Sequence, residues 1–260
     1  MEKLSKIAIT GYSGSIGIEF PRNCQKLKTR LEKSINKMIF EINNLKIMPE
    51  TLIHLSALVS TKKCDASLRK ANELNVLGSI KWYKASKITG IKNFIFVSTS
   101  HVYKSTRSLD VNVNIGFQKK PKNNYGKSKL EAEKNLQFLS KIIGYPNLVI
   151  ARVFSVYSLN AREGFLINDL FKRKKKKFFL TIYGKNVQRD FIDSKKIKEQ
   201  LIKISINKNK KKIYHICSGK TKTVGEICVK ILGKDFYNKC KKKKIYNTNW
   251  MSLIGRQTII

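Results

Sequence analysis

The 260-residue sequence contains no run of about eighteen or more apolar residues, the length at which a membrane-spanning helix is considered. The first apolar run begins near Lys6, which leaves no room for a secretion signal before it. None of the cysteines form a Cys-x-x-Cys pair, which argues against a zinc site or a disulfide framework. These absences predict a cytoplasmic protein with reduced, packed cysteines and no metal. The cysteines are Cys24, Cys64, Cys217, Cys228 and Cys240.

Acidic residues are also scarce. Seventeen Asp and Glu stand against fifty-four Lys and Arg, which gives a formal net charge of +37. Such a field attracts nucleic acid, anionic surfaces and polyanionic substrates. The basic runs at 172–177, 208–212 and 241–244 lack the interleaved aromatic side chains on which bases stack. We therefore interpret them as solvated loops and helix faces, with nucleic-acid binding as the lesser alternative.

A glycine-rich turn follows the first apolar run. Residues 6–9 (KIAI) lead directly into residues 10–17 (TGYSGSIG). A strand, a glycine-rich turn and a helix start, in this order, are typical of a dinucleotide site. Gly11 permits the tight turn, Gly14 the approach of a pyrophosphate, and Gly17 close packing of the helix on the sheet. We expect the helix N-terminus to offer N–H groups to the phosphates; the alternative is a loop that serves only as a turn.

Tyr125 and Lys129 stand four residues apart in a segment with a helical pattern. Residues i and i+4 share one face of a helix. An ammonium beside a phenol stabilises the phenolate, so a group with an ordinary pKa of about 10 can act as a base nearer neutrality. The same spacing also occurs on surface helices, where a lysine covers a half-buried tyrosine. Upstream, another apolar run ends in Ser98-Thr99-Ser100, at the sheet edge where ligands of open parallel sheets bind.

Taken together, these segments resemble the extended short-chain dehydrogenase/reductase family, which contains the nucleotide-sugar epimerases, dehydratases and reductases. The resemblance covers residues 6–227. Its further matches are 52–57 (LIHLSA), 75–79 (NVLGS), 98–103 (STSHVY), 125–129 (YGKSK), 151–157 (ARVFSVY), 183–191 (YGKNVQRDF) and 214–219 (YHICSG).

The resemblance and the spacing of the apolar runs predict the same fold class. Apolar runs near 6–10, 51–56, 93–98, 147–151 and 213–217, separated by helical patterns, favour right-handed βαβ units and a parallel sheet. We expect an α/β protein: a Rossmann-type doubly wound parallel sheet with a small C-terminal α/β substrate lobe. The expected NAD(P)-binding domain is 1–155 and the lobe 156–260, with segments near 189–217 returning to the sheet.

The resemblance implies three catalytic residues. Tyr125 takes a proton from a sugar hydroxyl while hydride leaves the same carbon for the nicotinamide. Lys129 binds the nicotinamide ribose and lowers the pKa of Tyr125, and Thr99 bonds the same substrate oxygen, with Ser98 and Ser100 as alternatives.

The resemblance also implies the cofactor, NAD or NADP. Relatives hold the adenosine ribose with an acidic residue after the second strand, expected here near 25–28, but Lys26, Lys28 and Arg30 occupy this area. Basic residues suit the 2′-phosphate of NADP, so both cofactors stay open, with NAD slightly favoured. The implied cofactor-binding residues are Gly11, Ser13, Gly14, Ser15, Ile16, Gly17, Leu55, Ser56, Ala57, Asn75, Ser98, Tyr125 and Lys129.

The implied substrate is a nucleotide-diphosphate sugar, held by Ser100, His101, Ser155 and Arg189. A guanidinium such as that of Arg189 suits a diphosphate, although a surface salt bridge to Asp190 is the alternative. Dehydratase relatives carry an Asp-Glu pair directly after the catalytic threonine, and Ser100-His101 stands there instead, which weighs against dehydration.

The sequence therefore predicts an NAD(P)-dependent nucleotide-sugar epimerase that works by transient oxidation. A 4-keto-sugar-nucleotide reductase is the close alternative, and a non-catalytic dinucleotide-binding or RNA-associated protein is the alternative from a different class. Relatives imply a homodimer. A helix at 165–171 is expected to cover the sugar nucleotide, followed by a strand at 178–183, and Asn124 is expected to cap the Tyr125 helix.

Overall fold

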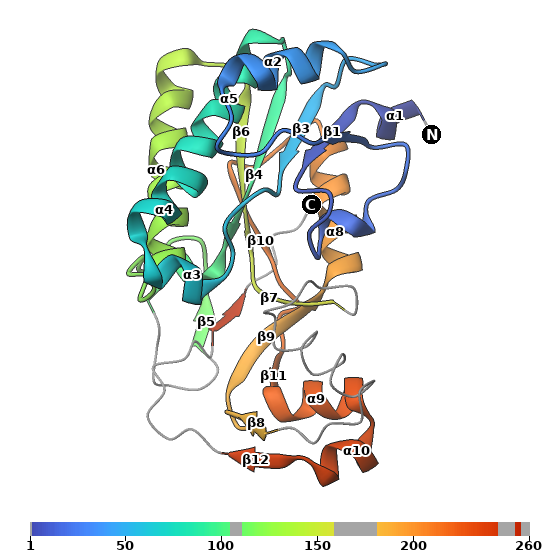
Figure 1. Ribbon diagram of the computed structural model, residues 1–260, viewed down its shortest axis with the longest axis vertical. Coiled ribbons are helices and arrows are strands. Elements are labelled where there is room, and N and C mark those ends of the chain that lie inside the picture. The colour runs from blue at the N-terminus through green and yellow to red at the C-terminus, as the bar shows by residue number, and fades with distance from the viewer. Residues whose placement is uncertain (1, 105–110, 159–180, 244–252, 256–260) are drawn as a thin grey trace.

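A six-stranded parallel sheet forms the centre of the protein, in the order β10-β6-β4-β3-β1-β2 (Figure 1). The computed structural model describes residues 2–104, 111–158, 181–243 and 253–255. The predicted Rossmann-type parallel sheet is confirmed. Its strands are β1 (Ile7–Thr10), β2 (Gln25–Leu27), β3 (Thr51–His54), β4 (Asn93–Thr99), β6 (Asn147–Val153) and β10 (Ile213–Ile216).

The strand order reverses between β1 and β3. The chain passes from β1 outward to β2, crosses back to β3 on the other side of β1, and then continues outward through β4, β6 and β10. In open α/β sheets, ligands bind at the carboxyl ends of the strands beside such a reversal. The glycine-rich turn after β1 and residues 55–57 after β3 therefore flank the expected site.

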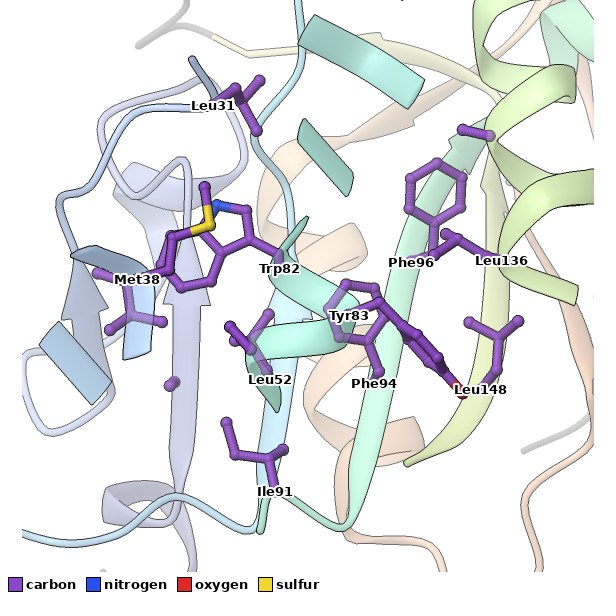
Figure 2. Close-up of a cluster of buried hydrophobic side chains, with 14 of the residues drawn as sticks. Leu31, Met38, Leu52, Trp82, Tyr83, Ile91, Phe94, Phe96, Leu136 and Leu148 are labelled. Atoms are coloured by element: carbon purple, nitrogen blue, oxygen red, sulfur yellow. The ribbon is translucent and has the colours of Figure 1, made fainter. Parts of the chain in front are cut away.

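Helices cover both faces of the sheet (Figure 1). On one face lie α2 (Ile35–Asn43), α5 (Gly78–Ile88) and α6 (Asn124–Ile143), and on the other lies α8 (Ser194–Ile206). Figure 2 shows the apolar cluster under the first set, where Trp82 and Tyr83 of α5 pack with Phe94 and Phe96 of β4. Since both faces are buried, the central strands are nearly continuous apolar runs, whereas the edge strand β2 is polar and partly exposed. The smaller helices beside them are α1 (Glu2–Ser5), α3 (Thr61–Ala66) and α4 (Leu68–Asn72).

The helix expected after the glycine-rich turn is reduced to one 3-10 turn, η1 (Gly17–Glu19). Phe20 leaves the helical conformation with φ −71° and ψ 139°. This is the extended geometry that a residue before a proline prefers, and Pro21 follows it. The expectation of a helix N-terminus for the phosphates is therefore wrong, because a three-residue turn sums too few peptide dipoles. Phe20 instead packs into the apolar cluster under α8.

A smaller lobe lies beyond the carboxyl end of the sheet (Figure 1). Its three-stranded sheet has the order β11-β9-β7, and β12 pairs with β8. Glu226 and Thr223 form a reciprocal capping box at the start of α9. The predicted helix 165–171, the basic run 172–177 and residues 178–180 lie outside the described residues. The elements of the lobe are β7 (Ser155–Tyr157), β8 (Thr181–Tyr183), β9 (Gln188–Asp193), β11 (Thr221–Thr223), α9 (Val224–Leu232), α10 (Lys234–Lys239) and β12 (Lys241–Lys243).

One late segment returns to the main domain. The strand β13 (Leu253–Gly255) pairs in parallel with β5 (Val111–Val113). The Gly255 N–H donates to Asp190 Oδ2 at 3.1 Å, and a Cβ on Gly255 would lie 2.6 Å from the Cys217 side chain. Only glycine permits this close approach, which places residues 253–255 against Cys217.

None of the helices within the described ranges is long and apolar enough to cross a membrane.

Candidate active site

Tyr125 lies in the first turn of α6, and this turn packs against the segment that follows β4. Asn123 is the N-cap: its Oδ1 accepts from the Gly126 N–H at 2.7 Å, so the predicted cap at Asn124 is wrong by one residue. A Cβ on Gly126 would collide with the carbonyl oxygen of His101. Glycine at this position therefore lets the Tyr125 turn approach the strand end, a role that the sequence reasoning missed.

The structure brings Thr99 and Tyr125 together. Thr99 is the last residue of β4, and its side chain lies close enough to the Tyr125 hydroxyl to act on its pKa. The Thr99 Oγ1 also accepts from the His101 N–H at 3.2 Å, which starts the 3-10 turn η3 (Ser100–Val102). Burial raises the pKa of Tyr125 to about 12, although the interaction with Thr99 acts in the opposite direction. The phenol is therefore protonated at neutral pH.

Lys129 lies one helical turn after Tyr125 and is buried. Its Nζ lies 3.8 Å from the centroid of the Phe96 ring, a cation–π contact. Burial lowers the pKa of Lys129 to about 7, and the charge of Glu133 only partly opposes this. The predicted lowering of the Tyr125 pKa by Lys129 is not found: desolvation of the phenolate outweighs the interaction with Thr99, which acts to lower that pKa.

Asn75 ties the segment after β3 to α6. It lies in a π-helical turn, η2 (Glu73–Leu77), an irregularity often found at functional sites. Its Nδ2 donates to Ser128 Oγ at 2.9 Å and to the Leu58 carbonyl at 3.1 Å, and its Oδ1 accepts from the Leu58 N–H at 2.7 Å. Ser128 in turn donates to the Tyr125 carbonyl at 2.9 Å. The oxygen and both N–H groups of the Asn75 amide therefore hold the segment after β3 against α6.

A buried histidine extends this network to β1. The Thr10 hydroxyl bonds His54 Nδ1 at 2.9 Å, and His54 Nε2 bonds Ser79 Oγ at 3.1 Å. Because Ser79 donates its own proton to the Asn75 carbonyl at 2.7 Å, it must accept from an Nε2–H. Burial drives the pKa of His54 well below its ordinary value, so the ring is neutral. Sequence reasoning missed His54, whose only signal is a histidine inside an apolar strand.

The glycine-rich turn has the features of a phosphate cradle. Gly11 has φ +68°, and Gly14 N–H donates to the Gly11 carbonyl at 2.9 Å. A Cβ on Gly17 would collide with the backbone of residues 11–12, so this glycine packs on the turn itself and not on the sheet. The Oγ atoms of Ser15 and Ser98 are buried, and neither has a hydrogen-bond partner among the described residues. These donors, the glycine turn and the strand reversal fit a dinucleotide.

The remaining predicted cofactor residues border the same turn. Ser56 N–H donates to Thr10 Oγ1 at 3.2 Å, which joins the end of β3 to the end of β1. Leu55 and Ile16 pack into the cluster under α8, Ala57 is half-buried, and Ser13 is exposed.

We expect Gly11→Ala to weaken NAD(P) binding by about tenfold or more, a loss that corresponds to about 1.4 kcal/mol. A Cβ there would lie 2.8 Å from Ser56 N, so the ends of β1 and β3 would have to separate. Gly144→Ala is a matched control, since Gly144 has φ +64° but no atom within 4 Å of its Cβ position. Both variants carry the left-handed cost of about 1–2 kcal/mol. Cofactor fluorescence titration and urea unfolding separate the two effects; equal affinities would contradict this role of Gly11.

The predicted substrate residues come from three elements. Ser100 is buried in η3, Ser155 begins β7 opposite Phe191 of β9, and Arg189 lies on β9. Arg189 lies close enough to His101 for its charge to add to burial in lowering the pKa of His101 to about 4. The structure thus brings Arg189 and His101 together with Tyr125, whose ring centroid lies 5.7 Å from that of His101.

Asp190 binds backbone N–H groups, whereas the sequence offered a surface salt bridge with Arg189 as one alternative. Its Oδ1 accepts from the Ser218 N–H at 2.7 Å, and its Oδ2 accepts from the N–H groups of Gly219 at 3.0 Å and Gly255 at 3.1 Å. The buried carboxylate therefore anchors the loop after β10 and the C-terminal segment. Among the described residues, no group of three or more His, Cys, Asp or Glu side chains is placed to bind a metal ion.

Two solved structures illustrate the likeness of the fold. UDP-glucose 4-epimerase from Thermotoga maritima, solved with UDP-glucose, superposes with a TM-score of 0.79 at 20% identity, covering 97% of this chain and 90% of that one. RMD from Pseudomonas aeruginosa, complexed with NADPH, gives a TM-score of 0.79 at 19% identity, covering 96% and 89%.

Sequence comparisons indicate the family. A curated relative, GDP-6-deoxy-D-mannose reductase from Pseudomonas aeruginosa, is 21% identical over 187 residues, which span 69% of this chain and 61% of the relative. The model of the NAD dependent epimerase/dehydratase family matches residues 7–217. The chain therefore belongs to the NAD-dependent epimerase/dehydratase family.

Proposed function

We propose that this protein is an NAD(P)-dependent nucleotide-sugar epimerase that acts by transient oxidation at a sugar carbon. The observation that carries the proposal is the placement of Thr99 beside the Tyr125 hydroxyl, one helical turn before the buried Lys129, at the carboxyl edge of the sheet. A bound NAD(P) would supply reversible hydride transfer at the sugar carbon. As a phenolate, Tyr125 would take the hydroxyl proton and return it; this requires its pKa to fall from about 12, which the positive charge of a bound nicotinamide favours. Thr99 would orient that oxygen, and Lys129 would hold the nicotinamide ribose.

The residues that follow Thr99 favour epimerisation over dehydration. Elimination of water needs an acid and a base beside the oxidised carbon. The two residues after Thr99 are Ser100 and the neutral His101, and neither is a carboxylate. Epimerisation needs oxidation, rotation of the keto sugar and return of the hydride, and it asks for no additional acid. Arg189 and the net charge of +37 suit a substrate with a diphosphate.

A 4-keto-sugar-nucleotide reductase is the second candidate, favoured by the protonated state of Tyr125. A phenol with a pKa of about 12 is suited to give a proton to a keto oxygen as hydride arrives. Lys26, Lys28 and Arg30, around the end of β2, suit the 2′-phosphate of NADP. A reductase consumes its reduced cofactor with every turnover, whereas an epimerase regenerates it.

We also propose a cytoplasmic homodimer. Phe138 and Ile142 on α6 and Ile88 on α5 are exposed apolar side chains on neighbouring helices. Large exposed apolar patches are a common feature of protein interfaces, so these side chains are the surface on which we would place the dimer contact.

The test is native mass spectrometry with NAD(H), NADP(H) and UDP-, GDP- and dTDP-sugars, followed by turnover at substoichiometric cofactor. We expect a dimer that carries one cofactor per chain, and many sugar molecules converted per cofactor. Consumption of one NAD(P)H per sugar would identify the reductase instead. No sugar-nucleotide binding, together with a salt-sensitive RNA gel shift, would favour the non-catalytic alternative.

A further inference from the structure

The side chain of His101 is held in one tautomer by its neighbours. The Asn123 Oδ1 accepts from the Gly126 N–H at 2.7 Å, which fixes the Asn123 amide with its Nδ2 as the donor. This Nδ2 lies 2.9 Å from His101 Nδ1. Since the amide nitrogen can only donate, Nδ1 accepts, and the ring proton of neutral His101 lies on Nε2.

The surroundings of His101 oppose a second proton. The groups that face it are the Asn123 amide, the edge-on ring of Tyr125 from α6, and the guanidinium of Arg189 from β9. None of these is an anion. Burial, together with the charge of Arg189, lowers the pKa of His101 to about 4, so the ring is neutral at physiological pH.

The Nε2–H of His101 has no hydrogen-bond partner within the described ranges, and its atom is not sealed from solvent. It lies on a different edge of the ring from Asn123, in a side chain two residues after Thr99 and packed on Tyr125. A fixed donor beside the reacting hydroxyl is suited to bind and orient a neighbouring sugar oxygen, because hydroxyl oxygens accept hydrogen bonds.

We propose that His101 donates a hydrogen bond from Nε2–H to a sugar oxygen next to the reacting carbon, and that it acts as a fixed donor and never as a base. This inference rests on the proposed function. The Nδ1 lone pair faces the Asn123 amide and Nε2 already carries a proton, so neither nitrogen is available to remove a proton from carbon. Asn123 and Gly126 are then positioning residues, which act through His101.

The test measures the tautomer of His101 and the affinity of the protein for nucleotide sugars. The chain has only three histidines, so ¹⁵N NMR resolves each ring. At pH 7 we expect His101 as the neutral Nε2–H tautomer, with mixed tautomers in Asn123→Ala. His101→Phe should weaken binding of the nucleotide sugar by about tenfold, while His101→Gln, which keeps an N–H donor, should recover most of the affinity. NAD(P)H affinity, unchanged in all three variants, shows that the fold is intact.

A cationic ring, an Nδ1–H tautomer, or wild-type sugar affinity in His101→Phe would overturn the inference. If the wild-type protein binds nucleotide sugars and His101→Phe binds them equally well, the inference alone fails. If the wild-type protein binds none of them, the proposed function fails and the inference falls with it.

Discussion

Replacing Tyr125 with phenylalanine should lower turnover of a nucleotide sugar by about 10²–10⁴-fold, the range for loss of a general acid–base group. The change removes one oxygen atom, the hydroxyl oxygen that lies near the Thr99 side chain. The ring remains to pack against His101, so the packing around this position is kept. Steady-state kinetics, with product analysis for both epimerisation and keto reduction, measures the effect.

The cofactor should still bind to Tyr125→Phe, because the glycine cradle lies after β1 and its contacts run to β3. Tyr145→Phe is a matched control: its hydroxyl donates to the Gly90 carbonyl away from the carboxyl edge of the sheet, and its loss should leave turnover unchanged. Turnover by Tyr125→Phe within about tenfold of the wild-type value would contradict the proton-transfer role, since acid–base catalysis contributes at least about a hundredfold.

The strands of the main sheet could be predicted from the sequence because parallel strands are buried on both faces. Residues 93–98 and 147–151 therefore stand out as apolar runs, and the structure extends both by one or two residues. The meeting of Thr99 and Tyr125 also follows from order alone, since a strand end and the next helix start share one edge.

The features that the sequence did not reveal depend on the burial of side chains and on contacts between residues far apart in the chain. The spacing of Tyr125 and Lys129 predicts proximity but not burial, and burial decides the direction of both pKa shifts. Asn123 and Asn124 are equally good caps, so only the backbone selects between them. The pairing of β13 with β5 joins residues too distant in the chain for any local pattern to reveal. Pro21 could have predicted one of these differences, because a proline ends the helix that is expected after the glycine motif.

A buried ion pair fixes α6 to the sheet. Arg152 of β6 and Glu133 of α6 are 1% and 2% exposed, and two bonds join them: Nε to Oε1 at 3.0 Å and Nη2 to Oε2 at 2.6 Å. Burial alone would lower the pKa of Arg152, but the hydrogen bonds and charge of Glu133 raise it. Arg152 Nη1 also donates to the Tyr103 hydroxyl at 2.7 Å, which leaves the Tyr103 proton for His215 Nε2 at 2.5 Å. The pair thus joins the helix that carries Tyr125 and Lys129 to β6 and β10.

Glu133→Gln should therefore lower the free energy of unfolding by about 3–5 kcal/mol, because it leaves the guanidinium of Arg152 buried and uncompensated. Glu131→Gln on the same helix is the control: Glu131 is half exposed and lies 4.0 Å from Lys134, so its loss should cost less than about 0.5 kcal/mol. The double variant Glu133→Leu/Arg152→Met should recover much of the loss, since an apolar pair of similar volume removes the unpaired charge. Urea unfolding of the four proteins measures these differences. A cost below about 1 kcal/mol for Glu133→Gln would mean that water reaches Arg152, and that α6 is held mainly by its apolar face.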